Sequence, residues 1–228
     1  MQFRAWNDIP EFMQNKKVKK YYAILAKKRF SLQIKRVFDI VISLILIIVL
    51  SPVFLWISIW IKLDSKGSVF YCQERVTQYG KKFYIIKFRT MIENADQVGS
   101  LVTMENDSRI TRVGKKIRKY RVDEIPQLFN ILSGDMSFVG TRPEVQKYVD
   151  AYTEEMKATL LLPAGVTSEA SIGYKDESEF LKDAGDVDEV YIEKILPEKM
   201  KWNLRSLRKF SLLQDLKTMI RTIKAISS

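Results

Sequence analysis

The stretch from Ile40 to Ile61, IVISLILIIVLSPVFLWISIWI, carries no charge and decides how the rest of the chain is interpreted. At the rise of an α-helix, its 22 residues would cover about 33 Å, which matches the roughly 30 Å hydrocarbon core of a bilayer. Ser51-Pro52 lies near its middle, where proline removes a backbone hydrogen bond and clashes with the preceding turn. The stretch is therefore predicted to be a membrane helix that bends at Ser51-Pro52.

Basic residues flank this stretch on both sides, with Lys35 and Arg36 before it and Lys62 and Lys66 after it. Because positively charged flanks tend to stay in the cytoplasm, this pattern gives no preferred crossing direction. Two topologies remain open from these residues. One is a kinked helix that spans the bilayer, and the other is a re-entrant hairpin with both ends on the cytoplasmic side.

The composition limits the chemistry that the chain can perform. The 228 residues have a formal charge of +11, a single cysteine (Cys72) and no histidine. The charge favours anionic partners such as phosphorylated molecules, nucleic acid or lipid headgroups. One cysteine excludes an internal disulfide bond. Without histidine, catalysis must use carboxylates, lysine, tyrosine or hydroxyl groups, and a bound metal would be a hard ion held by oxygen.

The sequence outside the apolar stretch predicts strands followed by helices. β-Branched and aromatic residues at 69–73 and 82–88 predict a hairpin with its turn at Tyr79-Gly80. Apolar residues at helical spacing predict a basic amphipathic helix over 110–119, and a second helix is expected over 123–132. These two helices are also compatible with a helix-turn-helix, which keeps DNA binding open at this point.

Helices are also expected at the two ends of the chain. The basic, aromatic-rich residues 1–36 suit an anionic lipid surface, although a solvated arm or a nucleic-acid tail has the same composition. Residues 175–193 are predicted to be helical, and the last 30 residues form an amphipathic pattern that suits both core packing and a membrane interface. The predicted fold class is α+β and mainly helical, with a membrane helix, a small β-hairpin and amphipathic interfacial helices.

Two adjacent carboxylates stand out in the segment RVDEIPQLFN, which runs from Arg121 to Asn130. Proline is accommodated in the first turn of a helix, so Pro126 predicts a helix that begins near Asp123. This would put Asp123 and Glu124 at a positive helix end, which also attracts phosphate groups. An ordinary helix cap explains the same pair without any catalytic role.

Three short segments contain candidates for anion binding. If the second strand persists, Lys87 and Arg89 project from the same face. A following proline restricts the backbone of Arg142 to extended conformations, which would aim its guanidinium at a phosphate. Each of these residues is equally compatible with an ordinary surface charge. The full set of substrate-binding candidates is Arg75, Lys87, Arg89, Thr141, Arg142 and Pro143.

Taken in order, these motifs resemble the bacterial sugar transferase family, the monotopic phosphoglycosyl transferases that begin the assembly of polysaccharides and glycoprotein glycans. The resemblance extends from about Lys35 to Met219. Its pieces are KRVFD (35–39), SP (51–52), QERV (73–76), KFRTM (87–91), DEIPQLFNIL (123–132), GDMSFVGTRPE (134–144) and LQDLK (213–217).

The resemblance implies a re-entrant helix broken at Ser51-Pro52, an enzyme of the bacterial cytoplasmic membrane, and a catalytic domain on the cytoplasmic face. It implies that Asp123 is the nucleophile and that Glu124 partners it at a Mg²⁺ site. Asp123 would attack the β-phosphorus of a UDP-sugar and release UMP, and polyprenyl phosphate would then take the phosphosugar. Membrane-segment residues carried over from the family are Lys35, Arg36, Asp39, Ser51 and Pro52, and the four expected to stabilise phosphate charge are Arg75, Lys87, Arg89 and Arg142.

The resulting division of the chain is a basic amphipathic extension at 1–36, a re-entrant membrane helix at 37–62 and a catalytic domain at 63–228. Many relatives have Pro-Gly-Ile-Thr-Gly-Trp-Ala-Gln where this chain has PAGVTSEA at 163–170, which leaves the donor sugar undefined. The rival predictions are a membrane glycosyltransferase that releases UDP and a non-enzymatic basic scaffold. A membrane stretch ahead of the basic helices argues against a nucleic-acid partner.

Overall fold

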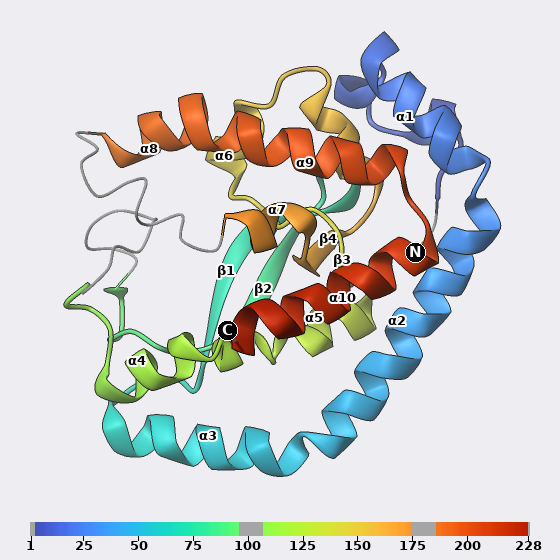
Figure 1. The fold of residues 1–228 in the computed structure, drawn as a ribbon. Coiled ribbons are helices and arrows are strands. Elements are labelled where there is room, and N and C mark those ends of the chain that lie inside the picture. The colour runs from blue at the N-terminus through green and yellow to red at the C-terminus, as the bar shows by residue number, and fades with distance from the viewer. Residues whose placement is uncertain (1–2, 96–106, 175–185, 228) are drawn as a thin grey trace.

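A computed structural model describes residues 3–95, 107–174 and 186–227. The chain folds into a mainly helical body around two small sheets, with a long bent pair of helices along one side (Figure 1). The two sheets are counted over the described residues only. The predicted class, α+β and mainly helical with a small hairpin, agrees with this arrangement.

The N-terminal extension is packed into the body of the protein. Two 3-10 turns precede α1 (Lys16–Ala26), whose side chains Val18, Tyr21 and Leu25 recur at helical spacing and are buried. They join a core cluster that also contains residues from α6 and α9, far away in the sequence. Asn15 caps α1 by accepting hydrogen bonds from the amides of Lys17 and Val18. The extension is therefore not a free arm, contrary to one of the two interpretations of its composition.

Helices α2 (Arg29–Val49) and α3 (Ser51–Asp64) meet at Leu50 with a bend of 60°. Pro52 lies in the first turn of α3, where its missing amide costs no helical hydrogen bond. Among the described residues, no single helix is long and apolar enough to cross a bilayer, whereas this bent pair meets both criteria when taken together. The predicted bend at Ser51-Pro52 is confirmed, and α2 runs without interruption through the predicted boundary at 36/37.

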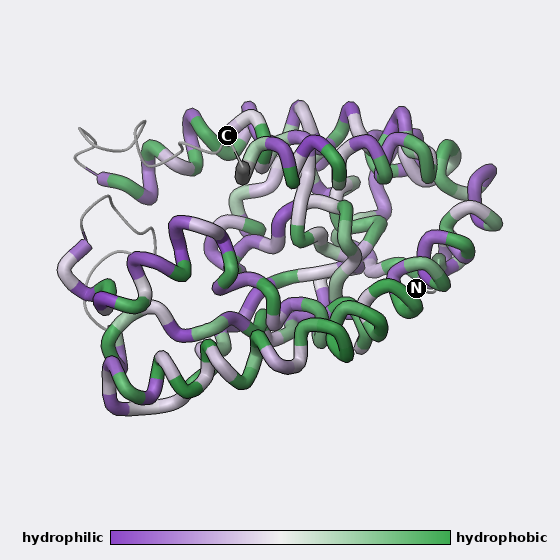
Figure 2. Tube along the Cα trace, turned by 60° about the horizontal axis from the view of Figure 1, so that its bottom comes forward, coloured by the Kyte–Doolittle hydropathy of each residue, from purple (hydrophilic) through white to green (hydrophobic). Residues whose placement is uncertain are grey.

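The bent pair exposes apolar side chains. One face of α2 is buried through residues at helical spacing, including Leu32, Lys35, Asp39 and Ser43. The outer side exposes apolar residues of both helices, and the tube of this pair in Figure 2 is mainly green with white and purple interruptions. Its exposed members are Val37, Phe38, Val41, Leu44, Ile45, Ile48, Val49, Val53, Leu55, Trp56, Ile59 and Leu63.

The predicted hairpin is present. Strand β1 (Phe70–Val76) pairs antiparallel with β2 (Lys82–Phe88), with Tyr71 opposite Lys87. The turn passes through Tyr79 and Gly80, which both have positive φ angles, 60° and 75°. β1 extends three residues beyond its predicted end at Gln73.

A second sheet had no counterpart in the sequence prediction. Strands β3 (Met136–Val139) and β4 (Ala164–Thr167) pair in parallel. Gly140 and Gly165 allow the two chains to approach closely at the end of this sheet, since a Cβ atom on Gly165 would lie 2.1 Å from the amide nitrogen of Gly140. This sheet places the segment after β3, which carries Arg142, beside β4.

The region around the carboxylate pair differs from the prediction in one respect. The basic helix is α4 (Arg112–Lys119), and α5 (Gln127–Ser133) begins after Pro126. Asp123 and Glu124 occupy a separate 3-10 turn, Val122–Glu124, so they precede the helix instead of beginning it. Arg121, with φ 53°, makes the sharp change of direction that separates this turn from α4.

The remaining helices lie in the C-terminal half of the chain. The C-terminal part of the expected helix over 175–193 is α8 followed by a π-helical turn, and its part at 175–185 lies outside the described residues. The elements of this half are α6 (Gln146–Asp150), α7 (Glu169–Gly173), α8 (Val187–Val190), the π-helical turn Tyr191–Ile195, α9 (Leu196–Arg208) and α10 (Leu212–Ser227). The apolar pattern predicted over the last 30 residues is divided between two helices: Leu207 of α9 is buried, whereas Leu213 and Ile223 of α10 are exposed.

Candidate active site

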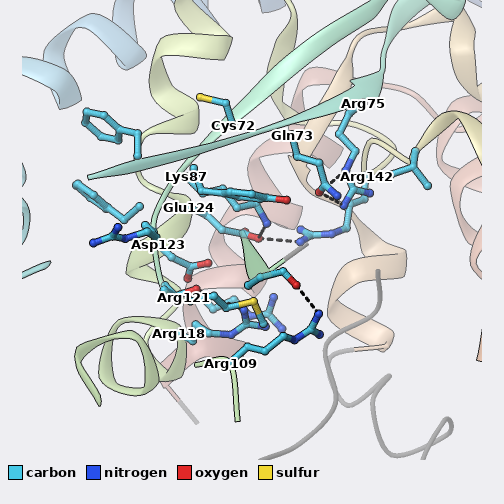
Figure 3. A pocket seen from close by; sticks show the side chains of 18 of the residues that line it. Cys72, Gln73, Arg75, Lys87, Arg109, Arg118, Arg121, Asp123, Glu124 and Arg142 are labelled. Atoms are coloured by element: carbon cyan, nitrogen blue, oxygen red, sulfur yellow. Dashed lines mark hydrogen bonds and ion pairs between the residues drawn. The ribbon is translucent and has the colours of Figure 1, made fainter. Parts of the chain in front are cut away.

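A pocket of about 770 Å³ opens between the hairpin, the Asp123 turn and the C-terminal helices. Its lining is rich in charge (Figure 3). Asp123, Glu124, Arg75, Lys87 and Arg142 all line it, although they come from four separate parts of the sequence. The structure therefore brings together both predicted catalytic carboxylates and, with Arg89, all four of the predicted anion-binding cations.

Glu124 is held between two cations. Its Oε1 atom lies 2.8 Å from Nη2 of Arg142 and 3.2 Å from Nζ of Lys87. Burial alone would raise the pKa of Glu124, but the charges of Arg142 and Lys87 outweigh that effect and hold the pKa far below its ordinary value. Glu124 is therefore a permanent anion that fixes two basic side chains in the wall of the pocket.

Asp123, the neighbouring residue, has the opposite environment. Burial and the negative charge of Glu124 raise its pKa above the ordinary value, against the influence of Lys87, Arg118 and Arg142. No hydrogen bond to its carboxylate comes from any residue in the described part of the chain. A carboxylate that is desolvated and not hydrogen-bonded is more nucleophilic than one that is fully solvated.

The turn that carries the pair is anchored through α5. The side chain of Asn130 accepts a hydrogen bond from the amide of Ile86 at 2.9 Å and donates one to the carbonyl of Tyr84 at 2.8 Å. Both partners belong to β2, the strand that carries Lys87. Asn130 therefore fixes the distance between Lys87 and Glu124, a role that sequence reasoning did not assign to it.

Arg75 lies on the same wall as Arg142. Its guanidinium donates to Oε1 of Gln73 at 2.6 and 3.1 Å and to the carbonyl of Pro143 at 3.3 Å. Oε2 of Glu144 lies 3.9 Å away. Together, Arg75 and Arg142 give this wall a positive edge that faces the pocket.

Three predicted substrate-binding residues have other surroundings. Arg89 lines the pocket, but its guanidinium donates to the backbone carbonyls of Ser65 and Lys66, in the loop after α3. It lies just beyond the end of β2, so the strand alternation that predicted a common face with Lys87 does not reach it. Pro143 contributes a carbonyl to Arg75, and Thr141 lines a separate cavity of about 50 Å³ beside α10.

Three of the five residues predicted for the membrane segment join α2 to the rest of the body, whereas Ser51 and Pro52 lie at the exposed bend. Lys35 pairs with Asp215 of α10 at 2.6 Å. Arg36 donates to the last carbonyls of α5, at Ile131 and Leu132. Asp39 accepts a long hydrogen bond of 3.4 Å from the amide of Phe138 in β3. These contacts join the bent helix pair to the same α5 that follows the carboxylate turn.

The carboxylate pair offers oxygen atoms of the kind that Mg²⁺ prefers. Both ion pairs of Glu124 use Oε1, which leaves Oε2 and the carboxylate of Asp123 as oxygen ligands. In the described residues, no group of three or more histidine, cysteine or acidic side chains is arranged for a metal. Mg²⁺ commonly binds through one or two carboxylates together with water and substrate phosphates.

Sequence reasoning missed several residues of the pocket because their role depends on tertiary contacts. Glu144 was quoted only as the end of a motif, and Tyr191 and Lys199 lie in a segment without recognisable chemistry. All three are buried in the wall next to Arg75. The positive charge of Arg118, which lines the pocket near Asp123, was predicted only as part of the basic face of a helix.

Comparison with known proteins identifies similar chains. A family model described as bacterial sugar transferase matches residues 30–228. The chain is 37% identical over 198 residues to a UDP-N-acetylgalactosamine-undecaprenyl-phosphate N-acetylgalactosaminephosphotransferase of Aeromonas hydrophila, which covers 85% of this chain and 43% of that protein. It is 42% identical over 125 residues to a putative undecaprenyl-phosphate N-acetylgalactosaminyl 1-phosphate transferase of Bacillus subtilis, covering 55% of this chain and 70% of the relative.

A third relative is similar along most of both chains. The exopolysaccharide production protein ExoY of Sinorhizobium fredii is 30% identical over 207 residues, which is 84% of each protein. The chain thus spans less than half the length of the Aeromonas relative and most of the length of the Sinorhizobium one.

Proposed function

Because this chain belongs to the bacterial sugar transferase family, we propose that it transfers a sugar 1-phosphate from a UDP-sugar to undecaprenyl phosphate and so starts the assembly of a surface polysaccharide or glycoconjugate. The observation that carries the proposal is the contrast within the carboxylate pair. Glu124 is fixed by two cations, whereas Asp123 lies beside it with a raised pKa and without a hydrogen bond from the described residues.

In the proposed reaction, a carboxylate oxygen of Asp123 forms a bond to the β-phosphorus of the UDP-sugar, and the bond between that phosphorus and the UMP oxygen breaks. UMP leaves, and the sugar phosphate remains on Asp123 as an acyl phosphate. An oxygen of undecaprenyl phosphate then attacks the same phosphorus and returns the carboxylate. Two displacements with a protein nucleophile replace one direct transfer between two bulky anions.

The charges of the pocket support this chemistry. Arg75, Lys87 and Arg142 line the wall beside the pair and would stabilise the charge that spreads over the phosphoryl oxygens. Asp123 and Glu124 would hold Mg²⁺, which neutralises diphosphate charge when it is bound. Of these residues, Glu124 orients the two cations it already binds, and Asp123 supplies the reacting oxygen.

The exposed apolar face of α2 and α3 supports the membrane part of the proposal. We propose that the bent pair enters one leaflet and returns, with both ends and the catalytic body on the cytoplasmic face of the bacterial inner membrane. The 60° bend at Leu50 and the basic residues on both flanks favour a re-entrant hairpin over a spanning helix. Every backbone amide and carbonyl buried in lipid needs an internal partner, which a helical hairpin provides apart from its short break.

The topology can be tested with single cysteines at the two ends of the pair. Cys72 is the only native cysteine and is exposed, so it is first replaced by serine. Cysteines at Arg29 and Lys66 should then both react with a membrane-impermeant reagent from the cytoplasmic side. Labelling from opposite sides would show a spanning helix.

The reaction can be tested by incubating membranes that contain the protein with UDP-sugars labelled in the sugar and the β-phosphate, with Mg²⁺ and undecaprenyl phosphate. The expected results are release of UMP and a labelled covalent adduct when the lipid is omitted. Asp123→Asn should lower turnover by at least about 1000-fold and yield no adduct, while membrane association is unchanged. Asp135→Asn is the matched control, since Asp135 pairs with Lys81 outside the pocket.

The possible outcomes separate the competing functions. Release of UDP instead of UMP would identify a glycosyltransferase that moves sugar alone. Turnover that survives Asp123→Asn would remove this residue from the mechanism. Absence of any nucleotide release, with or without Mg²⁺, would favour a non-enzymatic membrane scaffold.

A further inference from the structure

A second glutamate, Glu144, also lines the pocket. Glu144 is 6% exposed, and its Oε1 accepts a hydrogen bond of 2.7 Å from the hydroxyl of Tyr191. Lys199 donates to the same hydroxyl at 2.9 Å, and its Nζ lies 3.9 Å from Oε1 of Glu144. Tyr191 and Lys199 are themselves 3% and 5% exposed, so the three side chains form one buried cluster.

The other side of Glu144 faces the hairpin. Nη1 of Arg75 lies 3.9 Å from Oε2 of Glu144 and donates to the carbonyl of Pro143 at 3.3 Å. The backbone carbonyl of Glu144 accepts a hydrogen bond of 2.9 Å from the amide of Val76. Pro143 and Glu144 are thus held by the end of β1 on one side and by the C-terminal helices on the other.

Arg142 is the residue immediately before this anchored pair. Its Nη2 reaches Glu124 at 2.8 Å, so its guanidinium lies at the carboxylate turn. A guanidinium on a long side chain keeps one orientation only if its backbone is fixed. The backbone of Arg142 is fixed by Pro143 and Glu144, and Glu144 is in turn held by two residues that lie about 50 positions later in the chain.

We propose that Tyr191 and Lys199 are positioning residues of the transferase: they hold Glu144, and through it they hold Arg142 in register with Glu124 and with the phosphate group of the donor. The inference rests on the proposed function, because it assigns Arg142 to a reacting phosphate. Neither residue touches the reacting atoms in this scheme. In this scheme, their effect on the reaction passes through Glu144 and Arg142.

The local helix geometry supports a special role for Tyr191. It begins a π-helical turn, Tyr191–Ile195, that leads directly into α9 with Pro197 near its start. Wide turns of this kind inside helices occur often at functional sites, since they cost stability compared with an uninterrupted α-helix. The ring of Tyr191 also packs on Tyr148, with 4.6 Å between the ring centres, which fixes the direction of its hydroxyl.

A cluster of the same chemistry elsewhere in the protein provides a control. The hydroxyl of Tyr21 donates to Glu155 at 2.6 Å and accepts from Arg208 at 2.6 Å, but this cluster joins α1 to α9 away from the pocket. Tyr21→Phe and Tyr191→Phe each remove the tyrosine hydroxyl from a cluster of one tyrosine, one carboxylate and one cation. A purely structural role predicts the same consequences for both.

The first experiment compares these two variants in the UMP-release assay and in thermal unfolding. Tyr191→Phe should lower kcat/KM for the UDP-sugar by about 10-fold, the value of one hydrogen bond to a charged group, whereas Tyr21→Phe should leave kcat/KM within about 2-fold. Lys199→Met should resemble Tyr191→Phe, and Lys199→Arg should restore part of the loss because it keeps the charge. Equal kinetic behaviour of Tyr191→Phe and Tyr21→Phe would overturn the proposal.

The second experiment tests whether the effect passes through Arg142. In an Arg142→Gln background, Tyr191→Phe should cause less than about a 2-fold further loss, because the group it positions is already absent. A full 10-fold loss in both backgrounds would show that Tyr191 acts independently of Arg142 and would also overturn the proposal. Failure of the proposed function gives a different result, since the unmodified protein would then release no UMP at all.

Discussion

Two regions depart from the usual distribution of side chains. The wall of the pocket buries charged groups, and the outer face of α2 and α3 exposes apolar ones. In the pocket wall, the side chains of Glu124 and Glu144 are only 12% and 7% exposed. On the outer face, Ile48 and Leu55 are 65% and 64% exposed. One region removes charge from solvent, and the other presents hydrocarbon to it.

Each region is unfavourable when only water contacts it, which indicates the kind of partner that it binds. Among the described residues that line the pocket, basic side chains outnumber the carboxylates Glu93, Asp123, Glu124 and Glu144, and an anionic diphosphate would balance the excess. The apolar face is larger than the scattered apolar residues on an ordinary protein surface, and lipid would cover it. The two regions therefore differ in the partner that each needs, and changes in one should leave the other intact.

The largest expected effect on stability comes from the pocket wall. Glu124→Gln would leave Lys87 and Arg142 facing each other without their shared anion, so the free energy of unfolding should fall by about 3 kcal/mol. Transferase activity should fall as well, because both cations would lose their orientation. Chemical or thermal unfolding in detergent, together with UMP release, would measure the two effects.

The hairpin offers a matched control for this substitution. Glu74 pairs with Lys82 at 2.8 Å, but both side chains are about half exposed. Glu74→Gln should leave the stability nearly unchanged, as is usual for exposed ion pairs. A loss of similar size in both variants would mean that burial of the Glu124 cluster contributes nothing special.

A substitution on the apolar face should change membrane binding instead of stability. Leu55→Arg would place a charge on the face that we assign to lipid, at a cost of about 2.5 to 3.5 kcal/mol for a central position of a membrane helix. The variant should shift from the membrane fraction to aggregates or detergent-soluble protein while its unfolding in detergent stays close to that of the unmodified chain. Flotation with liposomes measures the shift.

A substitution of the same kind on the hairpin distinguishes lipid contact from a general effect of surface charge. Tyr84 is 62% exposed on β2, almost the same as Leu55. Tyr84→Arg should leave liposome binding unchanged. If it reduces binding as much as Leu55→Arg does, the outer face of α2 and α3 is not the distinctive membrane surface.

Sequence reasoning identified the features that depend on local pattern. The bend at Ser51-Pro52 follows from the geometry of one proline, and the hairpin follows from two β-rich runs around Tyr79-Gly80. The meeting of Lys87, Glu124 and Arg142 could be expected only through the family resemblance, since each residue alone resembles a surface charge. The prediction of a helix beginning at Asp123 was wrong because Pro126 lies just before α5, which leaves Asp123 in its own 3-10 turn.

Features that depend on contacts across the chain were not predictable in the same way. Strands β3 and β4 have four residues each and pair across more than 20 intervening positions, so neither shows a clear periodic pattern. The composition of the extension before Arg29 left a lipid-binding segment and a free basic arm open because its exposed lysines dominate, whereas Met13, Val18 and Leu25 are fully buried. Glu144, Tyr191 and Lys199 become a cluster only when the pocket forms.

The smallest effect that we expect is a change in stability on substitution of Asp123, and it distinguishes this carboxylate from Glu124. Because burial and Glu124 raise the pKa of Asp123 in the folded protein, its ionised form opposes folding. Asp123→Asn should therefore increase the free energy of unfolding by about 1 kcal/mol at pH 7, a common gain when a functional charge is removed. The measurement requires a chelator, since a bound divalent cation would stabilise the ionised carboxylate.

The pH dependence gives the sign of each contribution. The unfavourable charge of Asp123 is complete above its raised pKa and disappears as pH falls toward the ordinary value of 3.8, so the advantage of Asp123→Asn should shrink in that direction. Glu124 has a lowered pKa, so its stabilising contribution is complete above about pH 4.5 and is lost as pH falls below it. The two variants should thus differ from the unmodified protein with opposite signs at pH 7. A destabilised Asp123→Asn variant would mean that Asp123 is a structural carboxylate like Glu124 and not the nucleophile that attacks phosphorus.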